Sequence, residues 1–367
     1  MSNPHKPEEV VEQEPQGEEE SPLVHPLEIL AKASSDKKKS PKKLGSMLIG
    51  WTVLFISLVG GSCSGLFYYY MQMECQLIKN AWRLFLTSLM ILPFALIELK
   101  RKIDTDPNYL QTMKDPKYWK AMIIGSLGHT TWSVGLLISV NHTTMAHAYL
   151  FHSMHMVIIA FMKFFKGASL LREEILGTLL ATFGSIFLAM DHDVGSSSIV
   201  NLAAQSPLER FLLGDMVSLL SAIGGALFFT KSHEISQGFP TYTRVSIMSF
   251  MGSLIVATLS ITFEGATFSM DPQTGLFALL TERWFHLALL HALISGLGSY
   301  VCYQLSTKYF DPLLVSVVCA AEPVVSALLV FFLGWQSFPG LLTWVGFAVI
   351  LPSVIIISIA QNQNQNK

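Results

Sequence analysis

One carboxylate, Glu322, lies deep inside a long apolar stretch of the sequence, and Pro323 follows it. In a membrane helix a central charge costs about 2.5–3.5 kcal/mol on insertion scales, so such residues are rare and are often functional. Because proline has no backbone N–H, the carbonyl of Cys319 loses its usual helical partner. A bent helix beside an ionisable group can expose backbone polar groups to a cavity. The pattern indicates a proton or cation site or a counter-charge for a substrate; the alternative is a structural hydrogen bond at the bend.

A second apolar stretch is rich in histidine: it holds His147, His152 and His155, together with Tyr149. His152 and His155 are three residues apart and therefore share one face of a helix. Neutral histidine is cheap enough to bury and can change its charge near neutral pH. Three interpretations follow. The histidines line a cavity for an anionic or hydrogen-bonding substrate, or bind a metal, since imidazole suits zinc and copper, or form interhelical hydrogen bonds without any ligand.

Aromatic side chains in two further apolar stretches complete the candidate site. Trp132 lies too deep to anchor the chain at a lipid interface, so it either stacks on a substrate or packs in the core. The sequence predicts no catalytic residue, no metal ligand and no cofactor. The residues predicted to bind a substrate are His129, Trp132, Tyr149, His152, His155, Tyr300, Tyr303 and Glu322.

Ten apolar stretches carry these residues, each near the roughly 20 residues that span a hydrocarbon core. Hydrophobic residues make up 51% of the chain and charged residues 14%, whereas soluble domains carry about 25% charge. The fold class predicted is therefore an all-α polytopic membrane protein with ten transmembrane helices in the lipid bilayer. The predicted spans are 45–70, 78–98, 119–139, 143–164, 171–190, 211–231, 244–264, 284–306, 312–333 and 339–360.

The distribution of Lys and Arg predicts the orientation, because cytoplasmic loops carry an excess of them. With a cytoplasmic N-terminus, 20 of the 24 lysines and arginines fall inside, and Lys79 and Arg83 are among those outside. Both termini are then cytoplasmic. Trp82 and Trp284, at outer helix ends, are expected to anchor the chain at the lipid interface. The sequence does not resolve whether the membrane is the plasma membrane or an internal one.

The chain divides into two similar parts. Residues 1–43 are expected to form a disordered cytoplasmic tail, 44–190 a first five-helix repeat, 191–210 an external linker, 211–360 a second five-helix repeat and 361–367 a polar cytoplasmic tail. When the parts are aligned, His155 corresponds to Glu322 and Gly167 to Gly334. Because five is odd, the second repeat is inverted. Inverted repeats are typical of secondary transporters, which bind their substrate between the repeats near the midplane.

The C-terminal part resembles a known family. The stretches Ser295-Gly-Leu-Gly-Ser-Tyr-Val-Cys-Tyr, Asp311-Pro-Leu-Leu-Val-Ser and Ala321-Glu-Pro-Val-Val-Ser-Ala-Leu-Leu, with Gly334, resemble the end of an EamA-type domain of the drug/metabolite transporter superfamily. Asn80-Ala-Trp-Arg-Leu-Phe resembles its second helix. The resemblance implies ten helices in two inverted repeats, cytoplasmic termini and transport by alternating access. The chain departs from the family where Gly334 is followed by Trp-Gln instead of Glu.

The function predicted is secondary transport of a small organic metabolite through a midplane cavity, without enzymatic activity. The alternatives are a divalent metal ion transporter that uses the histidines, and a receptor or scaffold that does not transport. No GxxxxGK[ST] phosphate-binding loop occurs, which argues against ATP as the energy source. A membrane-embedded metalloenzyme would need a second ligand cluster beside His152 and His155. The partners expected are a small-molecule substrate and lipid, with no nucleic acid; a homodimer remains open.

Overall fold

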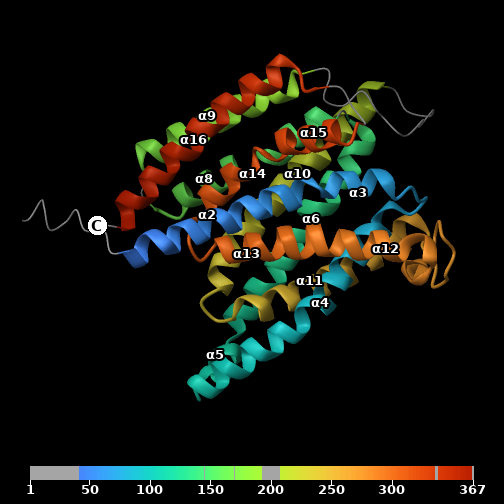
Figure 1. Cartoon of the computed structure of the whole chain (residues 1–367), viewed down its shortest axis with the longest axis horizontal. Coiled ribbons are helices and arrows are strands. Elements are labelled where there is room, and N and C mark those ends of the chain that lie inside the picture. Colours follow the sequence, from blue (N-terminus) through green and yellow to red (C-terminus); the bar gives the residue numbers. More distant parts are fainter. Residues whose placement is uncertain (1–40, 144, 169, 192–206, 335–337, 366–367) are drawn as a thin grey trace, which may run out of the picture. The chain divides into compact units, whose positions relative to one another are not determined.

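The computed structural model describes residues 41–143, 145–168, 170–191, 207–334 and 338–365, and its elements are helical. One isolated bridge joins Thr267 and Gly275. Figure 1 shows the helices, of which η1 and η3 are π-helices and η2 is a 3₁₀ helix. They are α2 (Pro41–Ser62), α3 (Ser64–Tyr70), α4 (Gln76–Thr105), α5 (Tyr109–Lys114), α6 (Pro116–His142), α7 (Met145–Ser153), α8 (His155–Phe165), α9 (Arg172–Ala189), α10 (Pro207–Ile235), α11 (Thr241–Leu259), η1 (Ser260–Glu264), η2 (Leu276–Leu280), α12 (Glu282–His291), η3 (Ala292–Val301), α13 (Cys302–Ser306), α14 (Pro312–Cys319), α15 (Glu322–Phe332) and α16 (Leu341–Gln365).

The chain separates into Met1–Gly45 and Ser46–Lys367. The second unit holds the described chain except for the first residues of α2. Most of the predicted tail 1–43 and of the predicted linker 191–210 lies outside the described residues, as do positions 366 and 367. The fold and the candidate site therefore belong to the second unit.

Nine helical segments of the described chain are long and apolar enough to cross a membrane, which confirms an all-helical protein of this class. Their ends lie within four residues of the predicted ones, except that Gln76–Thr105 continues about seven residues beyond the predicted end at 98. The predicted fifth span corresponds to α9, which has 18 residues and starts with Arg172, Glu173 and Glu174. Because of these charges, apolar length alone does not identify α9 as a span. The nine are Gly45–Tyr68, Gln76–Thr105, Pro116–His142, His147–Phe165, Leu212–Ile235, Thr241–Glu264, Glu282–Ser306, Pro312–Phe332 and Leu341–Gln361.

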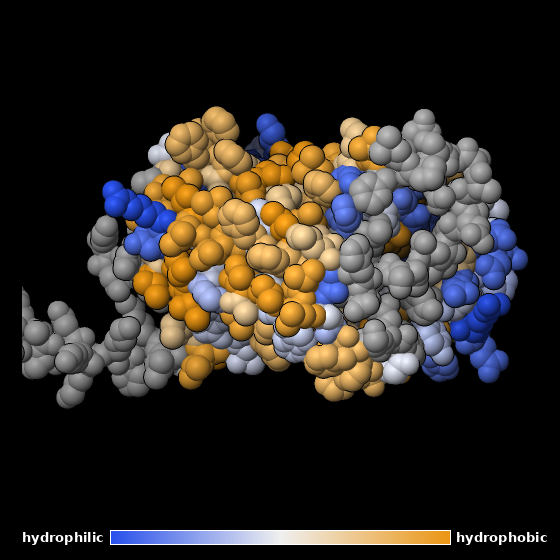
Figure 2. Space-filling view, turned by 90° about the horizontal axis from the view of Figure 1, so that it is seen from above, coloured by the Kyte–Doolittle hydropathy of each residue, from blue (hydrophilic) through white to orange (hydrophobic). Residues whose placement is uncertain are grey.

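Large apolar side chains cover the outer surface of the helices. Figure 2 shows one face, on which hydrophobic residues fill the middle and hydrophilic residues gather toward the ends. Soluble monomers rarely expose apolar patches of this extent, and a lipid bilayer is the environment that such a surface suits. Examples from two helices are Leu89, Leu92, Phe94, Leu96 and Ile97 of α4 and Leu341, Leu351, Ile355 and Ile359 of α16.

Three helix pairs make the most extensive contacts: α6 with α10, α4 with α11, and α9 with α16. Figure 1 shows α9 and α16 running side by side. Glycines let two of these pairs approach closely, as is common in membranes, where packing drives helix association. A Cβ added to Gly128 of α6 would lie 2.7 Å from the carbonyl oxygen of Gly224 in α10. A Cβ on Gly184 of α9 would lie 2.8 Å from the carbonyl oxygen of Gly346 in α16.

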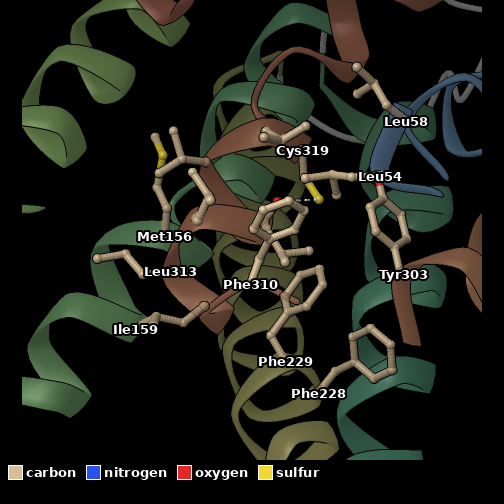
Figure 3. Packing of buried hydrophobic residues seen from close by; sticks show 14 of the residues in the cluster. Leu54, Leu58, Met156, Ile159, Phe228, Phe229, Tyr303, Phe310, Leu313 and Cys319 are labelled. Carbon is tan, nitrogen blue, oxygen red and sulfur yellow. Dashed lines mark hydrogen bonds between the residues drawn. The ribbon is translucent and has the colours of Figure 1, made fainter. Parts of the chain in front are cut away.

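The interior between the helices holds one large apolar cluster, contributed by α2, α6, α8, α10, α13 and α14 among others. Figure 3 shows part of it, with the rings of Phe228 and Phe229 close together. Their centroids are 5.0 Å apart. α14 is buried along its whole length, from Pro312 to Cys319. A span buried on every side explains why this segment carries so few polar residues.

The segment between η1 and α12 folds onto two tryptophans and corrects the prediction for them. Trp82 and Trp284 were expected at the lipid interface, but they are only 2% and 4% exposed. The indole N–H of Trp82 donates to the carbonyl of Leu276 at 2.7 Å, and that of Trp284 to Pro272 at 2.8 Å. Both rings therefore anchor a protein segment instead of lipid, because this segment covers the helix ends.

The close contact between α9 and α16 predicts a large effect of side-chain volume. Gly184→Val should lower the thermal stability of the purified protein, because overpacking typically costs about 1–3 kcal/mol. Differential scanning fluorimetry in detergent measures the melting temperature. Gly298→Ala is the control, since its Cβ would meet only the Leu293 carbonyl oxygen at 3.7 Å. Equal melting temperatures for the two variants would contradict the packing described.

Candidate functional site

The two apolar stretches that carry His155 and Glu322 are each broken into two helices. α7 ends at Ser153 and α8 begins at His155; α14 ends at Cys319 and α15 begins at Glu322. α8 and α15 have 11 residues each. Two residues beyond each end lies a glycine with φ of 73°, Gly167 and Gly334 respectively. Each ionisable residue is thus the first residue of a half-helix.

Different side chains break the two helices. In the second, Pro323 has no N–H to donate, and the backbone tightens: the amide of Ala321 donates to the carbonyl of Val318 at 3.0 Å. In the break between α7 and α8, the ring of His155 takes the place of a backbone N–H: its Nδ1 lies 2.7 Å from the carbonyl oxygen of His152. Because a carbonyl only accepts, this Nδ1 carries the hydrogen, and Nε2 of the neutral ring remains an acceptor.

Trp132 of α6 is the centre of an aromatic group. The ring of His152 stacks on it at 5.3 Å with an interplanar angle of 5°, and His155 meets it edge-on at 5.9 Å. Phe228 and Phe229 of α10 flank the indole at 5.8 and 5.5 Å. Trp132 therefore has the packed environment of a core residue and also a stacked imidazole, so both sequence interpretations of it describe part of its surroundings.

A chain of hydrogen bonds fixes His152. Its Nδ1 lies 2.7 Å from Oγ of Ser221, and that hydroxyl donates to the carbonyl of Trp132 at 2.6 Å. Since the single hydroxyl hydrogen is used on the carbonyl, Nδ1 of His152 is the donor to Ser221. Both histidines are therefore held as the same tautomer, with Nε2 facing away from these bonds.

Glu322 lies in a tightly packed polar group. The hydroxyl of Tyr303 donates to its carboxylate at 2.5 Å. A Cβ on Gly61 of α2 would lie 2.7 Å from Oε1 of Glu322 and 3.2 Å from Oγ of Ser299. The hydroxyl of Ser62 also donates to the backbone carbonyl of Glu322, at 3.1 Å. The carboxylate thus has one strong hydrogen-bond donor and a backbone against it, and among the described residues no ion pair joins it to a basic side chain.

All eight residues predicted to bind a substrate lie in one connected cluster. His129 packs on Tyr300 with ring centroids 4.1 Å apart and on Trp132 at 6.2 Å. Trp132 lies 6.3 Å from Tyr303, and Tyr149 lies 6.3 Å from His152. Every one of the eight is buried. The structure brings the eight residues together, and their role in binding stays a prediction.

His147 lies outside this cluster. Its Nδ1 is 3.6 Å from the carboxylate of Asp215, near the start of α10. Asp215 also accepts a hydrogen bond from the Thr143 hydroxyl at 3.0 Å. His147 therefore lies beside an acidic group, whereas His152 and His155 contact Trp132.

Three ring nitrogens of the cluster are buried without a hydrogen-bond partner: Nε1 of Trp132, Nε2 of His155 and Nδ1 of His129. Leaving a buried polar group unpaired costs about 1–3 kcal/mol. Trp132 offers a donor and His155 an acceptor, and the Cβ position of Gly225 lies 3.0 Å from the indole nitrogen and 3.2 Å from Cβ of His155. Unused donors and acceptors in one buried cluster are groups that a polar ligand could pair with.

Sequence reasoning missed a second polar group, which lies on α4. Lys79 and Arg83 were counted on the outer side, at the start of the predicted span 78–98, and they are 1% and 6% exposed. Asn80 lies between them and is fully buried. The spacing of Lys79 and Arg83 could have revealed this group, because residues i and i+4 share a helix face. Two cations on one face of an apolar helix indicate a shared polar environment.

The metal interpretation finds no ligand set in the part of the chain that the structure describes. There, no three His, Cys, Asp or Glu side chains are grouped so that they could hold a metal ion. His152 and His155 each use Nδ1 in a protein hydrogen bond, which leaves one nitrogen per ring.

Comparison with known proteins reports on the fold only. No family model and no curated protein matches the chain. Twenty-eight chains of solved structures match it. One of them, described only as "Crystal structure of protein", is 17% identical with a TM-score of 0.63, over 87% of this chain and 98% of that chain. At this identity the similarity extends to the fold and not to the activity.

The hydrogen bond between Tyr303 and Glu322 predicts a difference between two substitutions. Glu322→Ala should lower the melting temperature, because the Tyr303 hydroxyl then loses its buried acceptor, at a cost of about 1–3 kcal/mol. Glu322→Gln keeps an acceptor oxygen and should stay close to the wild type. Scanning fluorimetry of both variants tests this, and equal destabilisation by Ala and Gln would refute it.

Proposed function

We propose that the chain is a secondary transporter that moves a small organic metabolite by alternating access, through a site between two inverted five-helix repeats. The observation that carries the proposal is the position of His155 and Glu322. Each begins a half-helix at the break of its span, and the two breaks fall at the positions that the internal alignment pairs. Broken helices around a central site are a recurring feature of transporters with inverted repeats.

Glycine contacts support the repeat. Gly61, in the first predicted repeat, lies against the carboxylate of Glu322 in the second. Gly225, in the second, lies against Cβ of His155 in the first. Each central residue therefore packs on a glycine from the opposite repeat. The contacts between these glycine-bearing helices also correspond: Gly60 of α2 approaches the backbone of η3, and Gly224 of α10 approaches that of α6.

In the proposed arrangement α9 is a further span, the fifth of ten, and corresponds to α16, the last. These two helices pack against each other. The charge near the start of α9 is accommodated by the protein: Nζ of Lys163 donates to Glu174 at 2.7 Å, and Glu174 accepts from the backbone N–H of Leu171 at 3.2 Å. An ion pair of this kind explains how a helix with three charges in its first turn can still enter the bilayer.

The resemblance to EamA-type transporters agrees with this arrangement, and the proposal adopts its ten helices and cytoplasmic termini. Transport of a divalent metal, and a receptor or scaffold role, are outcomes of the tests below. Zinc or copper that binds the purified protein saturably, and only when His152 and His155 are present, would favour transport of a metal. A ligand that binds tightly but is never exchanged across a membrane would favour the receptor or scaffold role.

Ten spans predict opposite sides for two positions on either side of α9, α10 and α11. After the native cysteines are replaced by alanine, Lys166→Cys and Asp271→Cys should react with an impermeant maleimide from opposite faces of sealed vesicles. Both native residues are exposed. Labelling from the same face would mean that α9 does not cross, and the inverted five-helix repeat would then be excluded.

Transport should depend on the two central residues. In proteoliposomes loaded with a solute selected from amino acids, nucleosides and nucleotide sugars by thermal shift, His155→Ala and Glu322→Ala should each reduce counterflow at least about tenfold, a loss of roughly 1.4 kcal/mol or more. His286→Ala and Glu282→Ala, at exposed positions of α12, are the controls and should transport normally. Full counterflow in the folded His155 and Glu322 variants would remove both residues from the site.

A further inference from the structure

Arg83 is a buried cation whose hydrogen bonds go to a neutral group. Its Nε and Nη2 donate to the side-chain oxygen of Asn80, one turn away on α4, at 3.1 and 2.8 Å. Its side chain belongs to no ion pair among the described residues. A guanidinium has five N–H donors and no acceptor. Burying a charge without a counter-charge costs free energy, so a bound anion would stabilise Arg83.

The group around Arg83 has too few acceptors for its donors. The hydroxyl of Tyr68 also donates to the Asn80 side-chain oxygen, at 3.1 Å, so three donors from two residues share one acceptor. The amide nitrogen of Asn80 is already bound to Ser133 at 3.0 Å. Because Arg83 only donates, the Asn80 oxygen must face it, and the amide orientation is fixed. An oxyanion would supply the missing acceptors.

The neighbouring charges leave this region positive. Lys79 donates to the backbone carbonyl of Tyr68 at 2.9 Å and to the side chain of Gln76. Glu264 accepts the backbone N–H of Leu77 at 2.9 Å and the hydroxyl of Ser260 at 2.8 Å. These bonds hold its carboxylate at the start of α4, and among the described residues it forms no ion pair with Lys79 or Arg83.

Arg83 also adjoins the central cluster. Its partner Asn80 bonds to Ser133 of α6, and the hydroxyl of Ser133 donates to the carbonyl of Thr130 at 3.2 Å, on the helix that carries His129 and Trp132. His291 is fully buried, meets the ring of Tyr68 at 5.0 Å, and has no hydrogen-bond partner for either ring nitrogen among the described residues. The donor-rich group on α4 is therefore joined to the helix of the aromatic group by hydrogen bonds.

We propose that the transported metabolite is an organic anion, and that Arg83 binds its carboxylate or phosphate group while the remainder of the molecule contacts the aromatic residues around Trp132. The guanidinium suits this role, because its planar fork matches two oxygens of a carboxylate or phosphate and is more weakly hydrated than an ammonium group. This proposal rests on the proposed transport function, whose site it extends.

Binding to the purified full chain in lipid nanodiscs tests the proposal by calorimetry. The probes are succinate, glucose 6-phosphate and inorganic phosphate, with succinamide and glucose as the uncharged counterparts of the first two. At least one acid should bind saturably, and its neutral counterpart at least about tenfold more weakly. Comparing succinate with the two phosphates shows whether Arg83 binds a carboxylate or a phosphate group. Failure of every acid to bind at millimolar concentration, or equal binding of a neutral counterpart, would overturn the proposal.

Variants of the same protein locate the site. Arg83→Gln should weaken binding of the acid at least about tenfold, and Arg83→Lys, which keeps the charge but loses the fork, should have an intermediate affinity. Arg101→Gln, an exposed arginine of the same helix, should bind as the wild type does. Unchanged affinity in folded Arg83→Gln would overturn the proposal. If that variant fails to fold, Arg83→Lys and the comparison of acids with neutral counterparts on the wild type still decide it.

The same variants separate this proposal from the transport function. Binding of an acid that depends on Arg83, without exchange across vesicles, would support the anion site and reject transport. Exchange of a neutral or cationic solute that Arg83→Gln leaves unchanged would support transport and reject the anion site.

Discussion

A polar group buried among apolar helices must find its partner within the protein, because the hydrocarbon around it offers none. Two buried arginines meet this constraint differently. Arg244 of α11 donates to the carbonyls of Ser232 and Gln304, at 2.8 and 2.5 Å, and to the hydroxyl of Thr307 at 3.2 Å, so it ties three helical segments together. Among the described residues, the hydrogen bonds of Arg83 go to a side chain of its own helix. The contacts of Arg244 are those of a structural residue, whereas Arg83 itself donates to no other helix in the described chain.

The same constraint explains how two spans can be broken at corresponding positions by different residues. A helix breaks where a carbonyl loses its backbone donor, and the carbonyl must then be satisfied in another way. Between α7 and α8 the imidazole of His155 satisfies the carbonyl of His152, whereas between α14 and α15 Pro323 removes the donor and the backbone tightens. Both spans are therefore broken, and one break is followed by an imidazole and the other by a carboxylate.

The spans and the polar cluster could be predicted from the sequence. In lipid, an apolar stretch of sufficient length indicates a membrane span, and a polar residue inside it indicates a partner within the protein. The spans and the eight clustered residues follow from that rule. The rule fails at helix ends, where a charge can face solvent or be covered. Lys79, Arg83 and Trp82 lie near such an end, and the segment that folds over it, including Leu276, lies outside the predicted spans. Their burial is a tertiary effect, since it depends on how a loop folds back over the helices.

The central residues also connect binding with movement. Gly61 lies against Glu322, and Gly225 lies against His155 and the indole nitrogen of Trp132. Glycine allows a backbone to approach a polar side chain this closely, and in each case the backbone belongs to the opposite proposed repeat. A displacement of one repeat against the other would therefore change the surroundings of the carboxylate and of both rings at once. Conversely, a ligand that pairs with the unused nitrogens of Trp132 and His155 would favour whichever arrangement of the repeats leaves room for it, which is the coupling that alternating access requires.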